Sequence, residues 1–344
     1  MAGYRDTFLH LFRKPGALLP TRWLAAWSGQ RFIVPVFHTV SDDNPEHIRQ
    51  LYPVKTVRQF TADLDFLLKN YRPVNPLELE NLLHHGIFPK TNTFLLTFDD
   101  GLREFHDLIA PLLLQKGIPA ICFLNSDFVD NKSLFFRYKA SLLIGAFERE
   151  KQQIQSDPVI KWLKRYAPNQ INIRSALLSI SYQNRGALDE LATTVGLDFA
   201  DYLAKQQPYL NSDQILSLKN QGFCFGAHSC DHPEYRFLGL EEQLRQTRES
   251  VDSICNRFAL PYRTFAFPFT DYGVSKAFFQ NLYEQVPVIS LSFGCAGLKK
   301  DSFPQHIQRI PFETGDLSAK EILNNEYLYF LLKALAGKNR IHRT

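Results

Sequence analysis

Short apolar runs recur along the chain, and helical patterns with one apolar face separate them. In one such helical stretch, Phe60, Leu64, Leu67 and Leu68 fall on the same face. Strands that alternate with helices are typical of a parallel sheet or barrel, so we predict an α/β fold. The runs predicted to be strands are Phe32–Phe37, Thr93–Phe98, Ala120–Leu124, Phe223–Gly226, Thr264–Phe267, Val288–Phe293 and Ile307–Ile310.

Two segments depart from this alternation of strands and helices. From about residue 131 to residue 210 the chain is polar, rich in glutamine and favourable to helix, which predicts a helical insertion able to cap a site. Residues 1–31 form an amphipathic N-terminal segment in which Phe, Leu and Trp alternate with Arg and Lys. Such a segment can lie on an anionic membrane surface, although we expect a helix packed on the flank of the domain formed by residues 32–344.

The net charge, the apolar runs and the cysteines of the chain limit the partners and the location that we expect. A net charge of +4 is too small to predict a nucleic-acid partner, and no apolar run reaches the length of a membrane-spanning helix. The five cysteines are odd in number and irregularly spaced, and Cys122, Cys224 and Cys295 lie in or beside apolar runs. Reduced, mostly buried thiols are therefore expected. We predict a cytoplasmic protein, located at the inner membrane face if its N-terminal segment binds lipid.

Polar side chains stand just beyond several of the predicted strands. In parallel α/β folds, ligands bind at the carboxyl ends of the strands. Residues far apart in sequence can therefore converge on one binding site there. The residues in these positions are His38, Asp99, Asp100, Asn125, His228 and His232.

The first candidate motif is T-F-D-D-G, residues Thr97–Gly101, at the end of an apolar run. Adjacent carboxylates raise each other's pKa, so they are costly to place together without a cation. One of them can bind a metal ion while its neighbour acts as a general base, and the glycine permits a sharp turn. A plain β-turn at Asp-Gly is the alternative.

The second candidate motif is H-S-C-D-H, residues His228–His232, followed by Pro233. The proline disfavours helix at His232, so we predict a loop that aims both imidazoles at one ion. One carboxylate and two imidazoles suit Zn²⁺, with Co²⁺ or Ni²⁺ as alternatives, and leave positions for water and substrate. An Fe(II) oxygenase uses the same ligand types, although it usually places the carboxylate two residues after the first histidine.

In this order, the two motifs resemble those of the polysaccharide deacetylase family, the NodB-homology carbohydrate esterases. Thr97–Gly101 is similar to the first family motif and His228–His232 to the second, H-[ST]-x-x-H. Phe265–Phe269 resembles the third motif, which borders the site. The resemblance runs from about Val34 to Phe312, and it implies a distorted (β/α) barrel interrupted by the insertion.

The resemblance also implies roles for individual residues. Asp100, His228 and His232 would bind one divalent metal ion, and Asp99 would be the catalytic base that deprotonates water. A backbone amide near Phe269 would help to stabilise the oxyanion, and the side chain of this residue is a candidate contact for the sugar.

Two positions depart from the family pattern. The arginine that often stands two residues before the proline of the third motif is Ala266 here, and we predict that Arg309 supplies the missing charge. The family's general acid, the histidine of a Leu-x-His motif, has His306 as its nearest counterpart, with a surface histidine as the alternative. Tyr272 and Phe267 are further candidates for sugar contact, and core packing is the alternative for both of them and for Phe269.

These features predict a metal-dependent hydrolase that removes acetyl groups, chiefly N-acetyl, from a sugar. A catalytically weak or silent carbohydrate-binding barrel is the main alternative, because the family arginine is displaced and the general acid is uncertain. The expected partner is an acetylated sugar, a nucleotide sugar or a lipid-linked saccharide, and no nucleic acid.

Overall fold

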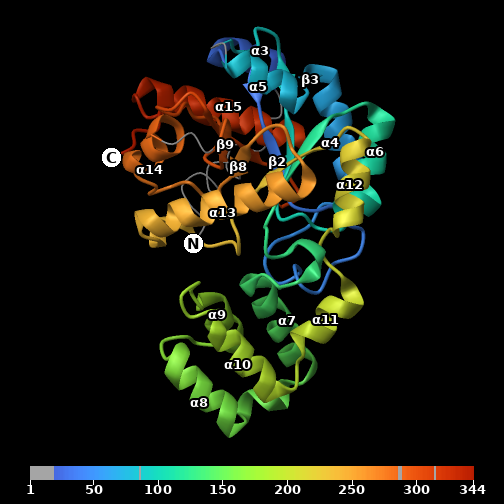
Figure 1. The fold of residues 1–344 in the computed structure, drawn as a ribbon, viewed down its shortest axis with the longest axis vertical. Helices are drawn as coiled ribbons and strands as arrows, with labels where there is room; N and C mark the ends of the chain where they lie inside the picture. The colour runs from blue at the N-terminus through green and yellow to red at the C-terminus, as the bar shows by residue number, and fades with distance from the viewer. Residues whose placement is uncertain (1–18, 85–86, 286–288, 314) are drawn as a thin grey trace.

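Parallel strands form the centre of the computed structural model, which describes residues 19–84, 87–285, 289–313 and 315–344 (Figure 1). The strands are β1 (Phe32–Ile33), β2 (Pro35–Phe37), β3 (Arg72–Pro73), β4 (Thr93–Phe94), β5 (Leu96–Phe98), β6 (Ala120–Leu124), β7 (Cys224–Ala227), β8 (Thr264–Ala266), β9 (Leu291–Gly294), β10 (His306–Gln308) and β11 (Ile310–Pro311). Among the described residues, the main sheet has eight strands in the order β10-β9-β8-β7-β6-β5-β2-β11, all paired in parallel. β1, β4 and β3 make a smaller parallel sheet.

The two edges of the main sheet come from one short stretch of chain. Arg309 alone separates β10, which pairs with β9, from β11, which pairs with β2. The amide of Arg309 donates to the carbonyl of Gly294 at 3.1 Å, and the amide of Ile310 donates to the carbonyl of Val34 at 2.8 Å. The sheet is therefore a nearly closed, distorted (β/α) barrel, and this part of the sequence prediction is confirmed.

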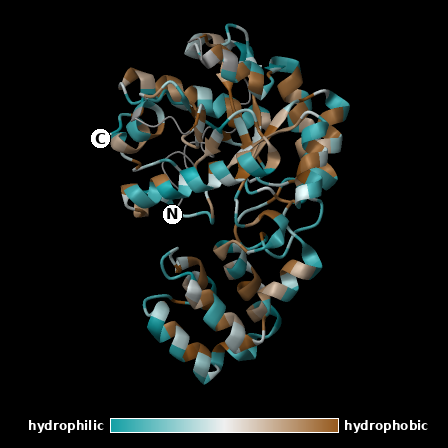
Figure 2. Ribbon diagram, in the orientation of Figure 1, coloured by the Kyte–Doolittle hydropathy of each residue, from teal (hydrophilic) through white to brown (hydrophobic). Residues whose placement is uncertain are grey.

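Helices cover the outside of the barrel. Helix α13 is mostly hydrophilic on the side seen in Figure 2, whereas the strands behind it are largely hydrophobic. In α4, the predicted apolar face buries Phe60, Leu64 and Leu67, and leaves Leu68 partly exposed. The helices around the barrel are α3 (Thr21–Ser28), α4 (Val57–Asn70), α5 (Pro76–His84), α6 (Ala110–Lys116), α12 (Ser212–Asn220), α13 (Leu240–Phe258), α14 (Lys276–Gln280) and α15 (Ala319–Leu335).

Between β6 and β7 the chain leaves the barrel and forms a lobe of helices, drawn below it in Figure 1. The lobe has a core of its own, in which Leu188 and Trp162 are buried, and this core continues to Leu102 and Phe128 beside the barrel. The lobe therefore packs against the carboxyl ends of the strands. Its helices are α7 (Phe136–Arg149), α8 (Asp157–Tyr166), α9 (Ile173–Ser179), α10 (Gly186–Val195) and α11 (Phe199–Gln206).

Of the predicted amphipathic segment, residues 1–18 lie outside the described residues. Helix α3 buries Leu24 and Ala25, and the hydroxyl of Thr21 donates to Asn324 Oδ1 of α15 at 2.7 Å. The same helix leaves two tryptophans on the surface, Trp23 and Trp27, 50% and 64% exposed. No helix among the described residues is long and apolar enough to cross a bilayer.

Candidate metal centre

The loop after β5 brings two carboxylates to the carboxyl end of the barrel. The amide of Asp99 continues the pairing with β2 by donating to the Phe37 carbonyl at 3.0 Å. Asp100 and Gly101 then both take the left-handed conformation, with φ of 70° and 62°. The left-handed φ favours glycine at position 101, and a Cβ atom there would also lie 2.6 Å from Leu124 Cδ2. The turn buries both carboxylates side by side.

His228 and His232 follow β7 in a loop, as expected from Pro233. His228 Nδ1 lies 2.8 Å from the carbonyl oxygen of Ala266. Because a carbonyl only accepts, Nδ1 carries the proton and Nε2 is left to bind a cation. The amide of His232 donates to the hydroxyl of Ser229 at 3.0 Å, and φ of His232 is 64°. The loop thereby turns both imidazoles toward the carboxylates.

The predicted ligand atoms converge. Asp100 Oδ1 lies 3.2 Å from His232 Nε2 and 3.6 Å from His228 Nε2, and the three atoms all lie within 4.8 Å of one another. All three residues are buried, and within the described part of the chain Asp100 Oδ1 and His228 Nε2 have no hydrogen-bond partner. Buried polar atoms without partners are costly, and a divalent cation would satisfy both. One carboxylate and two imidazoles fit Zn²⁺.

The protonation states suit metal binding. Burial lowers the pKa of His228 to about 4, although Asp99 opposes the shift, so this imidazole is neutral at neutral pH as a metal ligand must be. Burial raises the pKa of Asp100, but His232, together with His38 and His228, outweighs burial, and the pKa lies below the ordinary value. The cluster therefore holds a carboxylate that is ionised before any cation arrives.

Asp99 is held by Arg309. Nη1 and Nη2 of the guanidinium donate to Oδ1 and Oδ2 of Asp99 at 2.6 and 2.7 Å, and Nε donates to the Gly294 carbonyl at 3.1 Å. Burial raises the pKa of Asp99, but Arg309, together with His228 and His38, outweighs burial, so the pKa lies below the ordinary value and the carboxylate stays ionised. Asp99 Oδ2 lies 3.8 Å from His228 Nε2. A guanidinium thus reaches Asp99 from the junction of β10 and β11. The position of the third motif that often carries the family arginine is occupied by Ala266.

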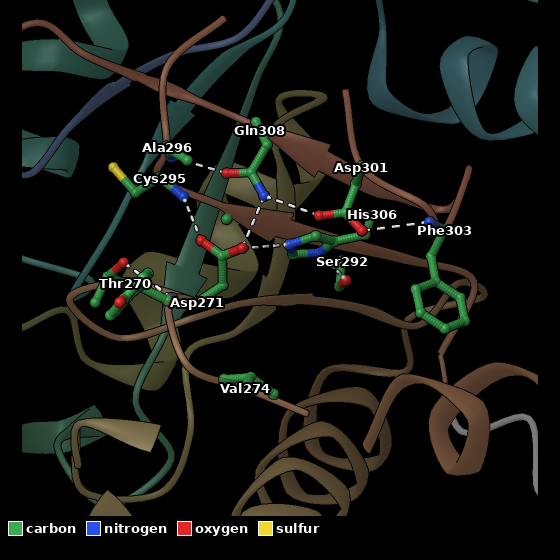
Figure 3. Close-up of polar contacts among 12 residues, drawn as sticks. Thr270, Asp271, Val274, Ser292, Cys295, Ala296, Asp301, Phe303, His306 and Gln308 are labelled. Carbon is green, nitrogen blue, oxygen red and sulfur yellow. Dashed lines mark hydrogen bonds and ion pairs between the residues drawn. The ribbon is translucent and has the colours of Figure 1, made fainter. Parts of the chain in front are cut away.

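His306 lies in a different cluster (Figure 3). Its Nε2 contacts Asp271 Oδ2 at 3.1 Å, and its Nδ1 contacts a serine hydroxyl at 2.5 Å. Gln308 also donates to Asp271, at 2.8 Å. Side chains two residues apart on a strand share a face, whereas Arg309 points from the opposite face into the metal centre. His306 is thus directed away from the centre, and this geometry does not suit its predicted role as general acid.

The sequence motifs did not point to His38, which follows β2. Its Nδ1 contacts Glu313 Oε2 at 2.6 Å, and Glu313 Oε1 accepts the amides of His38 and Thr39, both at 2.9 Å. Burial lowers the pKa of His38, but Glu313, together with Asp100 and Asp99, outweighs burial and raises the pKa to about 9. Its position at a strand end was visible in the sequence. Its partner was not, because β11 lies beside β2 only in the closed barrel.

The helical lobe reaches the centre through α7 and the residue before it. The hydroxyl of Tyr138 donates to Asp100 Oδ2 at 2.9 Å. The ring of Phe135 lies 4.3 Å from the ring of His232, and the ring of Phe269 lies 4.6 Å from it, between centroids. The lobe therefore orients one predicted metal ligand and covers another.

The three aromatic residues predicted to contact sugar differ in exposure. Phe267 is buried in the core, whereas Phe269 and Tyr272 are 42% and 73% exposed on the loop after β8. Phe269 has a left-handed φ of 56° and lies against the metal centre. Of these three residues, Phe269 and Tyr272 are the exposed ones.

Comparisons with known proteins lead to the same family as the motifs. Residues 88–283 match the family model described as polysaccharide deacetylase. This match covers more than half of the chain, and the protein belongs to the polysaccharide deacetylase family. No curated protein matches it.

Two solved structures share the fold. The deacetylase PplD of Streptococcus pyogenes, in complex with acetate, has a TM-score of 0.53 at 13% identity, over 86% of this chain and 97% of that one. IcaB from Ammonifex degensii has a TM-score of 0.52 at 17% identity, over the same shares of the two chains. At these identities the likeness concerns the fold alone.

We expect Arg309→Met to lower the free energy of unfolding of metal-free protein by about 3–5 kcal/mol near neutral pH, because it leaves the buried Asp99 carboxylate unpaired. In the wild type, the lowered pKa of Asp99 contributes stability above the ordinary carboxyl pKa, and this contribution is lost as the pH falls. In the variant, the unpaired carboxylate is protonated more readily. Its deficit, measured by urea titration, should therefore shrink from about pH 7 to about pH 4.

The double variant Asp99→Asn/Arg309→Met is the matched control, since it removes both charges. It should recover much of the stability that Arg309→Met loses. A deficit that is equal in both variants and independent of pH would contradict the role assigned to this ion pair.

Proposed function

We propose that this protein is a metal-dependent hydrolase that removes an acetyl group, N-linked rather than O-linked, from a saccharide. The observation that carries the proposal is the convergence of Asp100, His228 and His232 beside an Asp99 carboxylate paired with Arg309. Family membership supports the same class of reaction. A divalent ion, bound by the first three residues, would polarise the acetyl carbonyl and lower the pKa of water.

Two residues of the chain would move protons. Asp99 accepts the proton of the attacking water, because Arg309 keeps it ionised and its Oδ2 faces the His228 side of the site. His38 donates a proton to the leaving nitrogen, with Glu313 holding its Nδ1 and leaving Nε2 as the donor. At one pH the base must be deprotonated and the acid protonated. The positive charge of Arg309 beside Asp99 and the negative charge of Glu313 beside His38 favour these two states.

On this proposal His38 replaces His306 as the proton donor. The alternative of a catalytically silent carbohydrate-binding barrel was suggested by the displaced family arginine and by the uncertain identity of the general acid. Arg309 beside Asp99, and His38 beside Glu313, supply a candidate for each. Release of acetate, without any need for an oxo-acid cosubstrate, distinguishes the proposed hydrolase from an Fe(II) oxygenase.

The proposed substrate is an acetylated saccharide, whether a polymer, a nucleotide sugar or a lipid-linked form. Phe269 and Tyr272 offer exposed aromatic faces on which a sugar ring can pack. We further propose a cytoplasmic location at the inner membrane face, with residues 1–31 in contact with lipid. Exposure of Trp23 and Trp27 on α3 supports the lipid contact.

Asp99→Asn and Asp100→Asn should separate the base from the metal ligand. Loss of the Asp100 carboxylate removes a ligand, so metal occupancy should fall, and excess Zn²⁺ should partly restore acetate release. Loss of the Asp99 base should leave the metal bound while kcat falls on the order of 10²–10⁴-fold. Metal content and acetate release from N-acetylated oligosaccharides measure the two effects. The reverse pattern would exchange the two roles, and full activity in both variants would refute the mechanism.

The pH dependence of kcat/KM tests the proton donor. A donor must be protonated, so activity should fall as the pH rises through the pKa of His38, which burial lowers but Glu313 and the nearby carboxylates raise above its ordinary value. Glu313→Gln should move this alkaline limb to lower pH, because a neutral amide stabilises the imidazolium less. His38→Gln should abolish the limb and lower kcat on the order of 10²-fold. The exposed His342→Gln variant is the control, and an alkaline limb that Glu313→Gln leaves in place would exclude His38 as the donor.

A further inference from the structure

The segment that follows α15 returns to the barrel and buries an arginine against the loop after β8. Arg343 donates to the main-chain carbonyls of Asp271 and Val274 at 3.1 and 3.4 Å. Its Nη2 also pairs with the carboxylates of Asp271 and Asp301. The guanidinium carbon lies 4.1 Å from the centroid of the Phe279 ring, and the side chain is only 3% exposed. One side chain thus binds both the backbone and the carboxylate of this loop.

Asp271 is the point at which the loop is fixed to the barrel (Figure 3). Its Oδ1 accepts the amide of Cys295 at 3.3 Å, and its Oδ2 accepts Gln308 Nε2 at 2.8 Å and contacts His306 Nε2 at 3.1 Å. Burial raises the pKa of Asp271, but His306 and Arg343 outweigh it, so the pKa lies below the ordinary value. The carboxylate is therefore ionised, and it is bound by the residue after β9, by two side chains of β10 and by Arg343.

The same loop carries both exposed aromatic residues of the candidate site. Phe269 precedes Asp271 by two residues and contacts the ring of His232, and Tyr272 follows Asp271 directly. Any displacement of Asp271 must therefore move the side chains on both sides of it. A misplacement of about 1 Å near a reacting group can cost on the order of 10²-fold in rate.

We propose that Arg343 is a positioning residue of the deacetylase site, which fixes Phe269 and Tyr272 at the mouth by holding Asp271. The inference rests on the proposed function, since it takes these two aromatics as substrate contacts. A second metal site at Asp271, Asp301 and His306 is the competing interpretation of this cluster. The guanidinium that already bridges the two carboxylates argues against it.

Kinetics of the metal-loaded Arg343→Ala variant test the proposal. We expect kcat/KM for an N-acetylated oligosaccharide to fall on the order of 10–100-fold, with metal content unchanged. Guanidinium ion at low millimolar concentration should restore part of the loss by refilling the site, and it should leave the wild type unaffected. The exposed Arg340→Ala variant, in the same segment, should behave as the wild type. Unchanged kinetics in Arg343→Ala, or a loss that guanidinium does not relieve, would overturn the proposal.

Hydrogen exchange gives a readout that does not depend on activity. Peptides that cover residues 268–275 should exchange faster in Arg343→Ala than in the wild type, while those that cover residues 97–101 should not change. If Arg343→Ala does not fold, Arg343→Lys is the substitute variant, because lysine keeps the positive charge but lacks the planar guanidinium group. It should show the same changes in kinetics and hydrogen exchange, but smaller ones. Wild-type exchange of the loop would overturn the proposal. A wild-type enzyme that releases no acetate would instead refute the proposed function, and the exchange result would still decide whether Arg343 holds the loop.

Discussion

The paired hydrogen bonds between Arg309 and Asp99 lie where the barrel closes and where its candidate chemistry begins. Arg309 stands between β10 and β11, so its backbone lies at the junction of the two edges of the sheet. A buried ion pair is tolerated when its geometry is good and its remaining donors find partners. The bidentate contact and the bond from Nε to Gly294 meet that condition. The junction of the two barrel edges and the guanidinium that faces the candidate base therefore belong to one residue.

Each buried acid around this junction has a different partner, and the partner determines its chemistry. A fixed guanidinium faces Asp99, the candidate proton acceptor, whereas imidazole nitrogens face Asp100 and suit it to share a cation with them. Glu313 instead lies against His38 and favours the protonated imidazole. Carboxylates within one small region can thus act as base, ligand and support for an acid. Loss of a partner should therefore change the role of the acid that it faces.

Local patterns in the sequence predicted much of this arrangement. Apolar runs indicated most of the barrel strands, and the rule that ligands gather at the carboxyl ends of parallel strands grouped Asp100 with His228. The contacts that could not be predicted join distant segments. Glu313 reaches His38 only because β11 lies beside β2, and Tyr138 reaches Asp100 from the helical lobe. The surroundings of His306 were not foreseen either, because motif position does not reveal which face of a strand a side chain occupies.

X-ray absorption spectroscopy of the zinc-loaded protein tests the central claim most directly, since it reports the atoms around the ion. The proposed centre predicts one Zn²⁺ per chain, with two imidazole nitrogens and one carboxylate oxygen from the protein and oxygen from water in the remaining positions. The double variant His228→Ala/His232→Ala should lose this ion. Sulfur in the coordination sphere, no ion in the wild type, or full occupancy in the double variant would contradict the account.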